Sequence, residues 1–354
     1  MDENLISRMI KEINGLNKQE TKIMEVCGTH THAIGKYGIR SLLNPETQLL
    51  SGPGCPVCVT SESTIDAAIK ILENDNVILT TFGDLVRVRG TYESILDQRI
   101  KSKTVKILYT PFEALEIAQS NKDKLVVFLA VGFETTAPVI ASAIQLALEK
   151  NILNIYFLCS LKLMPPVLKF ILDQNRQHIH GMICPGHVAA VMGEEYFQFI
   201  EREYDIPAVI AGFEAMDIIG AIYTVVQSRN NPGTKKFENL YRRSVRIHGN
   251  RIAKETINEV FEVSSTEWRG IGYIQDSALT MKASYAPFDA LKRFNIQLLP
   301  QPNRSQCMCK EILLGIKKPS ACNMFGTGCI PEHPLGPCMI SSEGACASYY
   351  RYQL

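Results

Sequence analysis

The sequence lacks a strong excess of charge of either sign, and it lacks any long apolar run. Its 37 Lys and Arg residues nearly balance its 36 Asp and Glu residues, which leaves a formal net charge of +1 over 354 residues. So small a net charge gives no general attraction to phosphate backbones or anionic lipids, so we expect no nucleic-acid partner. The longest apolar run, residues 125–133, is about half as long as a bilayer-spanning helix. We therefore expect no membrane span.

The amino terminus also lacks the features of an export signal. Residues 1–20 alternate charged and apolar side chains, with no apolar central region and no small-residue cleavage site. We therefore expect a cytoplasmic protein. Cysteine, by contrast, is abundant: there are 11, and six of them lie between Cys307 and Cys346. In a reducing compartment such a cluster is typical of a metal or redox site rather than of a disulfide framework.

Short apolar runs alternate with amphipathic stretches over the first 265 residues, which predicts an α/β fold. We expect two parallel-sheet α/β domains with helices on both faces, and a closed barrel is the alternative. Beyond about residue 268 the chain becomes rich in Gly, Pro and Cys, which predicts a small irregular C-terminal iron–sulfur domain. The predicted domains are residues 1–135, 136–267 and 268–354. The predicted strands are 22–26, 47–50, 77–81, 105–109, 125–131, 155–159, 181–183 and 208–210.

Four segments rich in Gly, Pro, Cys, His or Glu follow predicted strands, where functional residues of parallel sheets collect. The first, CGTHTH, combines the thiol of Cys27 with the imidazoles of His30 and His32. Thiolate and imidazole together suit iron, zinc or copper. The alternative is a buried cysteine beside two histidines at the start of a helix.

The second segment, GPGCPVC, places Cys55 and Cys58 in a C-x-x-C pair between a strand and a helix. The N-terminus of a helix lowers the pKa of a thiol, so the pair could cycle between dithiol and disulfide. It could also form half of a zinc site with Cys184 and His187 of the segment CPGH. A purely structural pair is the third possibility.

The remaining segment, GFETTAP, contains Glu134 and Thr135 after the most apolar strand. Glu134 could act as an acid or base or orient a ligand, and it could also be a solvated residue at a helix start. Near the C-terminus, the six cysteines are widely and irregularly spaced, which favours a [4Fe–4S] cluster over zinc. Four ligands must come from six cysteines, so the spacing does not select them. Glu343, just before Cys346, could face this redox centre or lie on the surface.

Together, the motifs CGTHTH, GPGCPVC, GFETTAP, CPGHVA and SSEGACASYYRYQ resemble the HypD family of [NiFe]-hydrogenase maturation factors. The resemblance runs from Met24 to the end of the chain, with the motifs in the family's order. It implies two α/β domains, a C-terminal [4Fe–4S] unit, and a scaffold on which the Fe(CN)2(CO) group is assembled for the hydrogenase large subunit. The implied partners are the chaperone HypC and HypE, which supplies the cyanide made with HypF.

The resemblance also implies roles for individual residues. Cys27 would hold the iron together with a cysteine of HypC, and Cys55 and Cys58 would form the thiol redox pair. The side chains that would line or serve the assembly cleft are those of His30, Glu134, Thr135, His187 and Glu343. The implied cluster ligands are Cys309, Cys322, Cys329 and Cys346. Cys307 and Cys338 are left without an implied role.

Two other functions are compatible with the residues alone. One is a stand-alone cytosolic iron–sulfur and thiol oxidoreductase that acts on a small substrate. The other is a zinc-dependent hydrolase that uses Cys55, Cys58, Cys184 and His187. Metal analysis would separate iron from zinc, and infrared bands of bound cyanide and CO would separate the scaffold from the oxidoreductase.

Overall fold

A computed structural model describes residues 3–17, 19–231, 233–299 and 307–352 of the chain. The chain divides into two compact units, each assembled from separated segments. Unit 1 comprises Met1–Cys55, Val167–Arg251 and Ser305–Leu354, and unit 2 comprises Pro56–Pro166 and Ile252–Arg304. Among the described residues, no helix has the length and apolar character needed to cross a bilayer.

The sheet of unit 1 is wholly parallel, with the strand order β2-β1-β7-β8-β9. Parallel strands put their carboxyl ends at one edge, so the loops after β1, β2, β7 and β8 share that edge. The apolar strands β7 and β8 are buried along their whole length, as expected for strands covered on both faces. The strands are β1 (Thr21–Glu25), β2 (Thr47–Ser51), β7 (Gly181–Pro185), β8 (Ala208–Ala211) and β9 (Phe237–Asn239).

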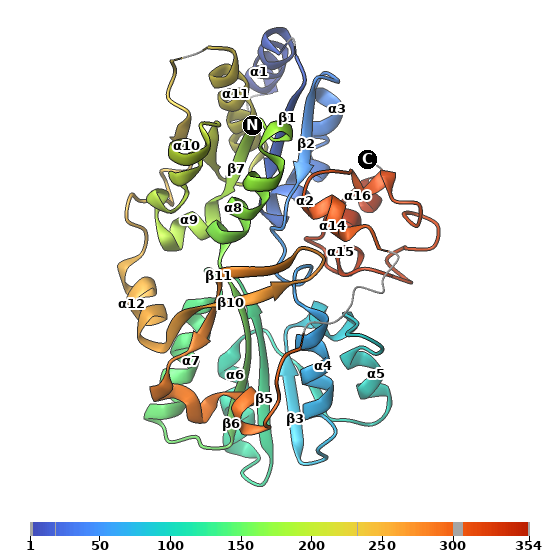
Figure 1. Cartoon of the computed structure of the whole chain (residues 1–354), viewed down its shortest axis with the longest axis vertical. Coiled ribbons are helices and arrows are strands. Elements are labelled where there is room, and N and C mark those ends of the chain that lie inside the picture. The colour runs from blue at the N-terminus through green and yellow to red at the C-terminus, as the bar shows by residue number, and fades with distance from the viewer. Residues whose placement is uncertain (1–2, 18, 232, 300–306, 353–354) are drawn as a thin grey trace. The chain divides into compact units, whose positions relative to one another are not determined.

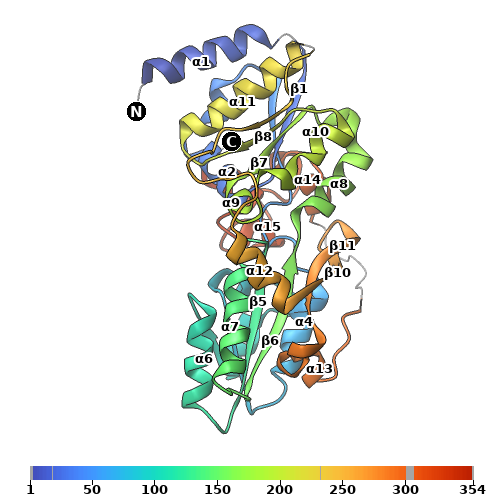
Figure 2. The same cartoon turned by 90° about the vertical axis from the view of Figure 1, so that its left-hand side faces the viewer.

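Helices pack on both faces of this sheet. Figure 2 shows α1 lying along α11, and their apolar faces meet α2 and the sheet in a core that contains Ile13, Ile34 and Ile222. The helices of unit 1 are α1 (Glu3–Leu16), α2 (Gly28–Lys36), α3 (Ile39–Leu42), η2 (Arg176–His178), α9 (Gly186–Met192), η3 (Glu194–Phe197), α10 (Phe199–Tyr204), α11 (Ala215–Asn230), α14 (Cys309–Leu313), η5 (Pro319–Ala321), α15 (Pro337–Ile340) and α16 (Ala345–Tyr352).

The C-terminal segment packs directly on α2 of unit 1, and Figure 1 shows α16 beside α2. Gly35 permits this close approach, because a Cβ there would collide with the ring of Tyr352. The Ser348 hydroxyl donates to the Thr31 carbonyl at 3.0 Å. The cysteine-rich tail is therefore anchored on the helix that follows Cys27.

The sheet of unit 2 is mixed, with the order β10-β11-β6-β5-β3-β4. Its four strands β3 to β6 are parallel, whereas β11 runs antiparallel to both β6 and β10. Figure 2 shows α6 and α7 on one face of this sheet and α4 on the other. The strands are β3 (Val77–Thr81), β4 (Val105–Ile107), β5 (Leu125–Gly132), β6 (Ile155–Lys162), β10 (Phe261–Trp268) and β11 (Gly272–Met281).

Several helices of unit 2 begin at residues with the expected capping chemistry. Ser94 and Thr110 each form a capping box, with Asp97 and Glu113 respectively. The helices are α4 (Glu62–Ile71), η1 (Gly83–Arg87), α5 (Ile95–Ile100), α6 (Pro111–Ser120), α7 (Ala137–Glu149), η4 (Ala283–Phe288) and α13 (Ala290–Arg293). The chain passes between the units within α8 (Met164–Asn175) and α12 (Arg251–Val260), and also near residues 55 and 304.

The predicted fold class is confirmed: the chain is α/β, with two mostly parallel sheets flanked by helices and a cysteine-rich C-terminal segment. All eight predicted strands are present, and the prediction missed β9, β10 and β11. The compact units differ from the continuous ranges 1–135, 136–267 and 268–354, because β7 pairs with β1 while β6 pairs with β5. Likewise β11, expected to be irregular, pairs with β10 and β6 in unit 2.

Candidate functional site

Cys27 lies at the carboxyl edge of the unit 1 sheet, where β1 gives way to α2. It is the N-cap of α2, with extended backbone angles (φ −146°, ψ 125°). Burial raises the pKa of the Cys27 thiol to about 12, and the charge of Glu343 adds to this rise. The hydrogen bonds from the N–H groups of His30 and Thr29 act to lower the pKa. The thiol is therefore protonated at neutral pH unless a cation binds it.

The glycine-rich turn before Cys55 lies against Cys27. A Cβ at Gly54 would collide with the backbone of Cys27, and the Gly28 N–H donates to the Gly54 carbonyl at 3.2 Å. Only glycine allows two backbones to approach so closely. Cys55, the first cysteine of the C-x-x-C pair, is therefore the next residue after Gly54, which contacts the backbone of Cys27.

The loop before α16 brings Glu343 to the same place. The Thr29 hydroxyl donates to Glu343 Oε1 at 3.1 Å, across 314 positions of the sequence. A Cβ at Gly28 would lie 2.5 Å from Glu343 Cβ, so a glycine is needed there as well. The negative charge of Glu343 also acts to raise the pKa of His32 and of His187. Glu343 is half-buried against α2, so it is not a freely exposed surface residue, and the prediction that it faces the redox centre stays a prediction.

Two of the predicted histidines stack on one aromatic ring. The ring centroids of His30 and His187 lie 4.7 Å and 3.9 Å from that of Phe213. Burial lowers the pKa of His30 to about 4 and also lowers the pKa of His187, so both imidazoles are neutral at pH 7. His30 Nε2 lies 2.8 Å from the Gly212 carbonyl, whereas Nδ1 has no hydrogen-bond partner among the residues that the structure describes.

Sequence reasoning missed Phe213 and Glu25. Phe213 follows β8 at the same sheet edge as the predicted motifs, and that position was the available signal. Glu25 is buried at the end of β1, where it accepts from the Thr31 hydroxyl at 2.6 Å and from the Cys27 N–H at 3.3 Å. Burial raises the pKa of Glu25 to about 7, against the influence of Thr31, Ser51 and Arg40. A carboxyl at the end of a predicted strand, two residues before Cys27, was the corresponding signal.

Cys346 and four of the other five C-terminal cysteines lie near one another. Burial and the neighbouring thiols of Cys338, Cys307, Cys329 and Cys322, in that order, raise the pKa of Cys346. The Leu335 N–H donates to Cys329 Sγ at 3.3 Å, a contact that would also stabilise a thiolate.

The predicted ligand Cys309 is the exception. It is buried at the first position of α14, whereas the four thiols with the largest effect on Cys346 are those named above. Cys307, which the prediction left without a role, is one of these four, and a Cβ at Gly336 would collide with Cys307 Sγ. No three Cys, His, Asp or Glu side chains within the described ranges are arranged as a ready-made metal site. These thiols therefore lie near one another without the geometry of a metal site, and the cluster stays a prediction.

The C-x-x-C pair does not lie at a helix N-terminus, contrary to the prediction. Residues 56–59 form a turn, and α4 begins only at Glu62, where Ser61 is the N-cap and accepts from the Thr64 N–H at 3.4 Å. Cys55 and Cys58 are both buried; Cys55 is the last residue of a unit 1 segment, and Cys58 belongs to unit 2.

Glu134 and Thr135 belong to unit 2. Glu134 is fully buried, so it is not the solvated residue of the alternative interpretation, and its Oε1 accepts from the Met164 N–H at 2.6 Å at the start of α8. Thr135 is exposed. Cys184 is buried in β7, and burial alone raises the pKa of its thiol.

Comparison with known proteins bears on the meaning of this arrangement. Residues 4–353 match the family model HypD, described as "Hydrogenase formation hypA family". The chain belongs to the HypD family. It is 40% identical to the hydrogenase maturation factor HypD of Escherichia coli over 94% of this chain and 89% of that one. It is 39% identical to HypD of Rhodobacter capsulatus, over 98% and 93% of the two chains. A putative hydrogenase expression/formation protein of Methanocaldococcus jannaschii is 38% identical, over 99% and 98%. Membership in the HypD family supports a role in hydrogenase maturation.

Proposed function

We propose that this chain is the scaffold on which the Fe(CN)2(CO) group of [NiFe]-hydrogenase is assembled. It would act in the cytoplasm with a HypC-type chaperone and with HypE, which supplies the cyanide made with HypF. The observation that carries the proposal is the convergence of three motifs at one edge of the unit 1 sheet. Cys27 of CGTHTH, His187 of CPGH and Glu343 of SSEGAC lie together, although they are far apart in the sequence.

Cys27 is the residue we assign to the iron, which is the cargo of the scaffold. Low-spin iron that carries cyanide and CO needs soft, electron-rich ligands, and a thiolate is such a ligand. The buried thiol loses its proton only when a cation compensates the thiolate charge, so iron binding and proton release are coupled. A thiolate from the HypC-type partner would supply a second ligand. The neutral imidazoles of His30 and His187 add no positive charge that would compete with iron.

A [4Fe–4S] cluster is the resident cofactor that we propose for the C-terminal segment. The surroundings of Cys346 support Cys322, Cys329 and Cys346 as ligands, and they favour Cys307 or Cys338 over Cys309 as the fourth. Burial and the neighbouring thiols raise the proton affinity of Cys346, which is the effect that iron binding would relieve. When bound, such a cluster supplies single electrons.

Cys55 and Cys58 would serve as the thiol redox pair. Opening a disulfide between them takes two electrons and two protons, so a cellular reductant must deliver two single electrons for each dithiol formed. The dithiol could then hold the iron at Cys27, or it could supply two electrons and two protons to a reduction there as the disulfide re-forms. Cys55 is suited to this role because the turn that precedes it lies on the Cys27 backbone.

Infrared spectroscopy of the chain isolated with its HypC-type partner tests the proposal. The wild-type complex should show the stretching bands of bound cyanide and CO, and Cys27→Ala should abolish them. Cys159→Ala is the control, because Cys159 is a cysteine of β6 in unit 2 that belongs to none of the converging motifs. Undiminished bands in the Cys27→Ala complex would remove Cys27 as the iron ligand.

A further inference from the structure

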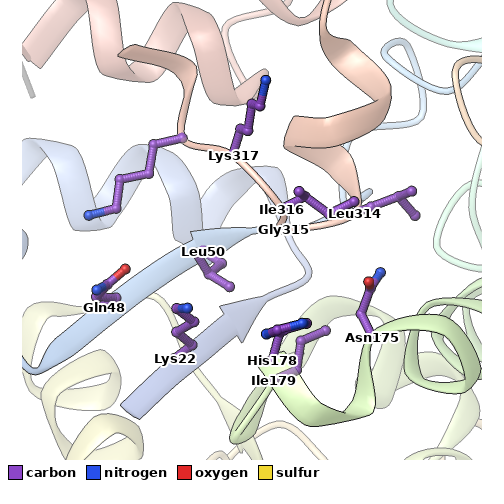
Figure 3. Close-up of a pocket in the computed structure, with 11 residues that line it drawn as sticks. Lys22, Gln48, Leu50, Asn175, His178, Ile179, Leu314, Gly315, Ile316 and Lys317 are labelled. Atoms are coloured by element: carbon purple, nitrogen blue, oxygen red, sulfur yellow. The ribbon is translucent and has the colours of Figure 1, made fainter. Parts of the chain in front are cut away.

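Unit 1 contains a pocket that the proposed function does not use. It has a volume of about 290 Å³ and lies over β1 and β2, beside the end of α8 and the segment 314–318. Figure 3 shows Lys22, Gln48 and Leu50 on the strands, with His178, Ile179 and Asn175 beside them. This volume is at the lower end of the range for small-molecule sites in proteins.

The lining of the pocket combines an apolar floor with cationic and hydrogen-bond-donating side chains. Leu50, Ile179, Leu314 and Ile316 supply the apolar surface. Three lysines line the pocket, whereas none of the 11 described lining residues is acidic. In a chain whose net charge is only +1, this is a marked local excess of positive charge.

Two groups in the pocket are available to a ligand. The buried Nδ2 of Asn175 has no hydrogen-bond acceptor among the residues described, so it is a donor in need of a partner. Lys22 pairs with Glu20 at 3.2 Å, but the Glu20 side chain is 55% exposed, and an ion pair this exposed is weak. A ligand anion can therefore compete with Glu20 for the Lys22 amine.

We infer that this pocket binds a small organic anion that has an apolar body, such as a carboxylate with a short hydrocarbon chain. The hydrocarbon would cover Leu50 and Ile179, and the carboxylate would accept from Lys22 and Asn175. One wall of the pocket, residues 314–318, lies between Cys309 and Cys322 in the sequence. A bound anion would therefore steady the segment that joins these two cysteines.

Calorimetric titration of the full-length chain with hexanoate, at low ionic strength, tests the inference, with 1-hexanol as the neutral probe of the same length. We expect one saturable hexanoate site per chain and at least about tenfold weaker binding of hexanol. Lys22→Gln should weaken hexanoate binding about tenfold. Lys235→Gln, which removes an exposed lysine of the same unit, should leave it unchanged. Equal binding of the two probes, or no hexanoate binding, would overturn the inference.

A second variant tests the location of the site. Ile316 is 57% exposed, so Ile316→Glu should fold normally while placing a negative charge in the pocket. We expect this variant to lose hexanoate binding, and circular dichroism would verify its fold. In the wild-type chain, hexanoate should slow hydrogen exchange at residues 314–318. Full binding by Ile316→Glu, or protection only elsewhere in the chain, would place the ligand outside this pocket and overturn the assignment.

Discussion

Gly28→Ala is a perturbation that should separate the C-terminal loop from Cys27. The backbone of Gly28 is compatible with alanine, since its φ lies outside the left-handed region. The added methyl group would, however, lie 2.5 Å from Glu343 Cβ and 2.7 Å from the Glu343 carbonyl oxygen. Because one of these contacts is with backbone, rotation of the Glu343 side chain cannot relieve the overlap. The loop must therefore move away from α2.

The expected magnitude follows from three contributions. Overpacking typically costs about 1–3 kcal/mol. Displacement of the loop also breaks the hydrogen bond from Thr29 to Glu343, which contributes about 1 kcal/mol. The better helix propensity of alanine at the start of α2 returns about 1 kcal/mol or less. We expect the free energy of unfolding to fall by about 1–3 kcal/mol.

Urea denaturation followed by circular dichroism measures this change, and the infrared bands of the complex report on the site. Gly15→Ala is the matched control, because nothing lies within 4 Å of a Cβ at that exposed helical position. It should leave stability unchanged or raise it by up to about 1 kcal/mol. If Gly28→Ala is as stable as this control and keeps full bands, the close contact between Gly28 and Glu343 does not hold the site together.

Three further predictions concern the cluster, the thiol pair and a buried lysine. Cys307→Ala should lower the iron and sulfide content and the visible absorbance of the purified chain far more than Cys309→Ala; the opposite order would restore Cys309 as a ligand. Cys58→Ser should keep that absorbance and abolish hydrogenase maturation in cells, and normal hydrogenase output would exclude the thiol pair from the mechanism. Burial lowers the pKa of Lys162 from its ordinary value of 10.5 to about 7. The unfolded chain therefore binds more protons between pH 7 and 10.5, so the free energy of unfolding should rise with pH over this window, by up to about 5 kcal/mol. Urea denaturation at several pH values should show a rise that is smaller by that amount in Lys162→Met. The same pH dependence of the free energy of unfolding in both proteins would refute the lowered pKa of Lys162.

Much of the fold could be predicted because most strands of the parallel sheets are encoded locally. The run Leu125–Gly132 is buried on both faces and is apolar throughout, so its pattern needs no partner to be recognised. The edge strand β10 was missed for the opposite reason. Its middle residues are exposed or only partly buried, and they include Glu262, Ser264 and Ser265, so no apolar run marks it. It is held as a strand by its long antiparallel pairing with β11.

The sequence by itself determined which chemical groups are available: the thiol of Cys27, the C-x-x-C pair and the C-terminal cysteines, each in a recognisable motif. The family could be named from these motifs because they are short and contiguous. Only the tertiary structure decided which groups meet. Glu343 reaches Thr29, and Phe213 stacks on His30, because α16 docks on α2 and because β8 ends at the same sheet edge as β1. Such contacts depend on packing between residues hundreds of positions apart, and no local pattern in the chain records them.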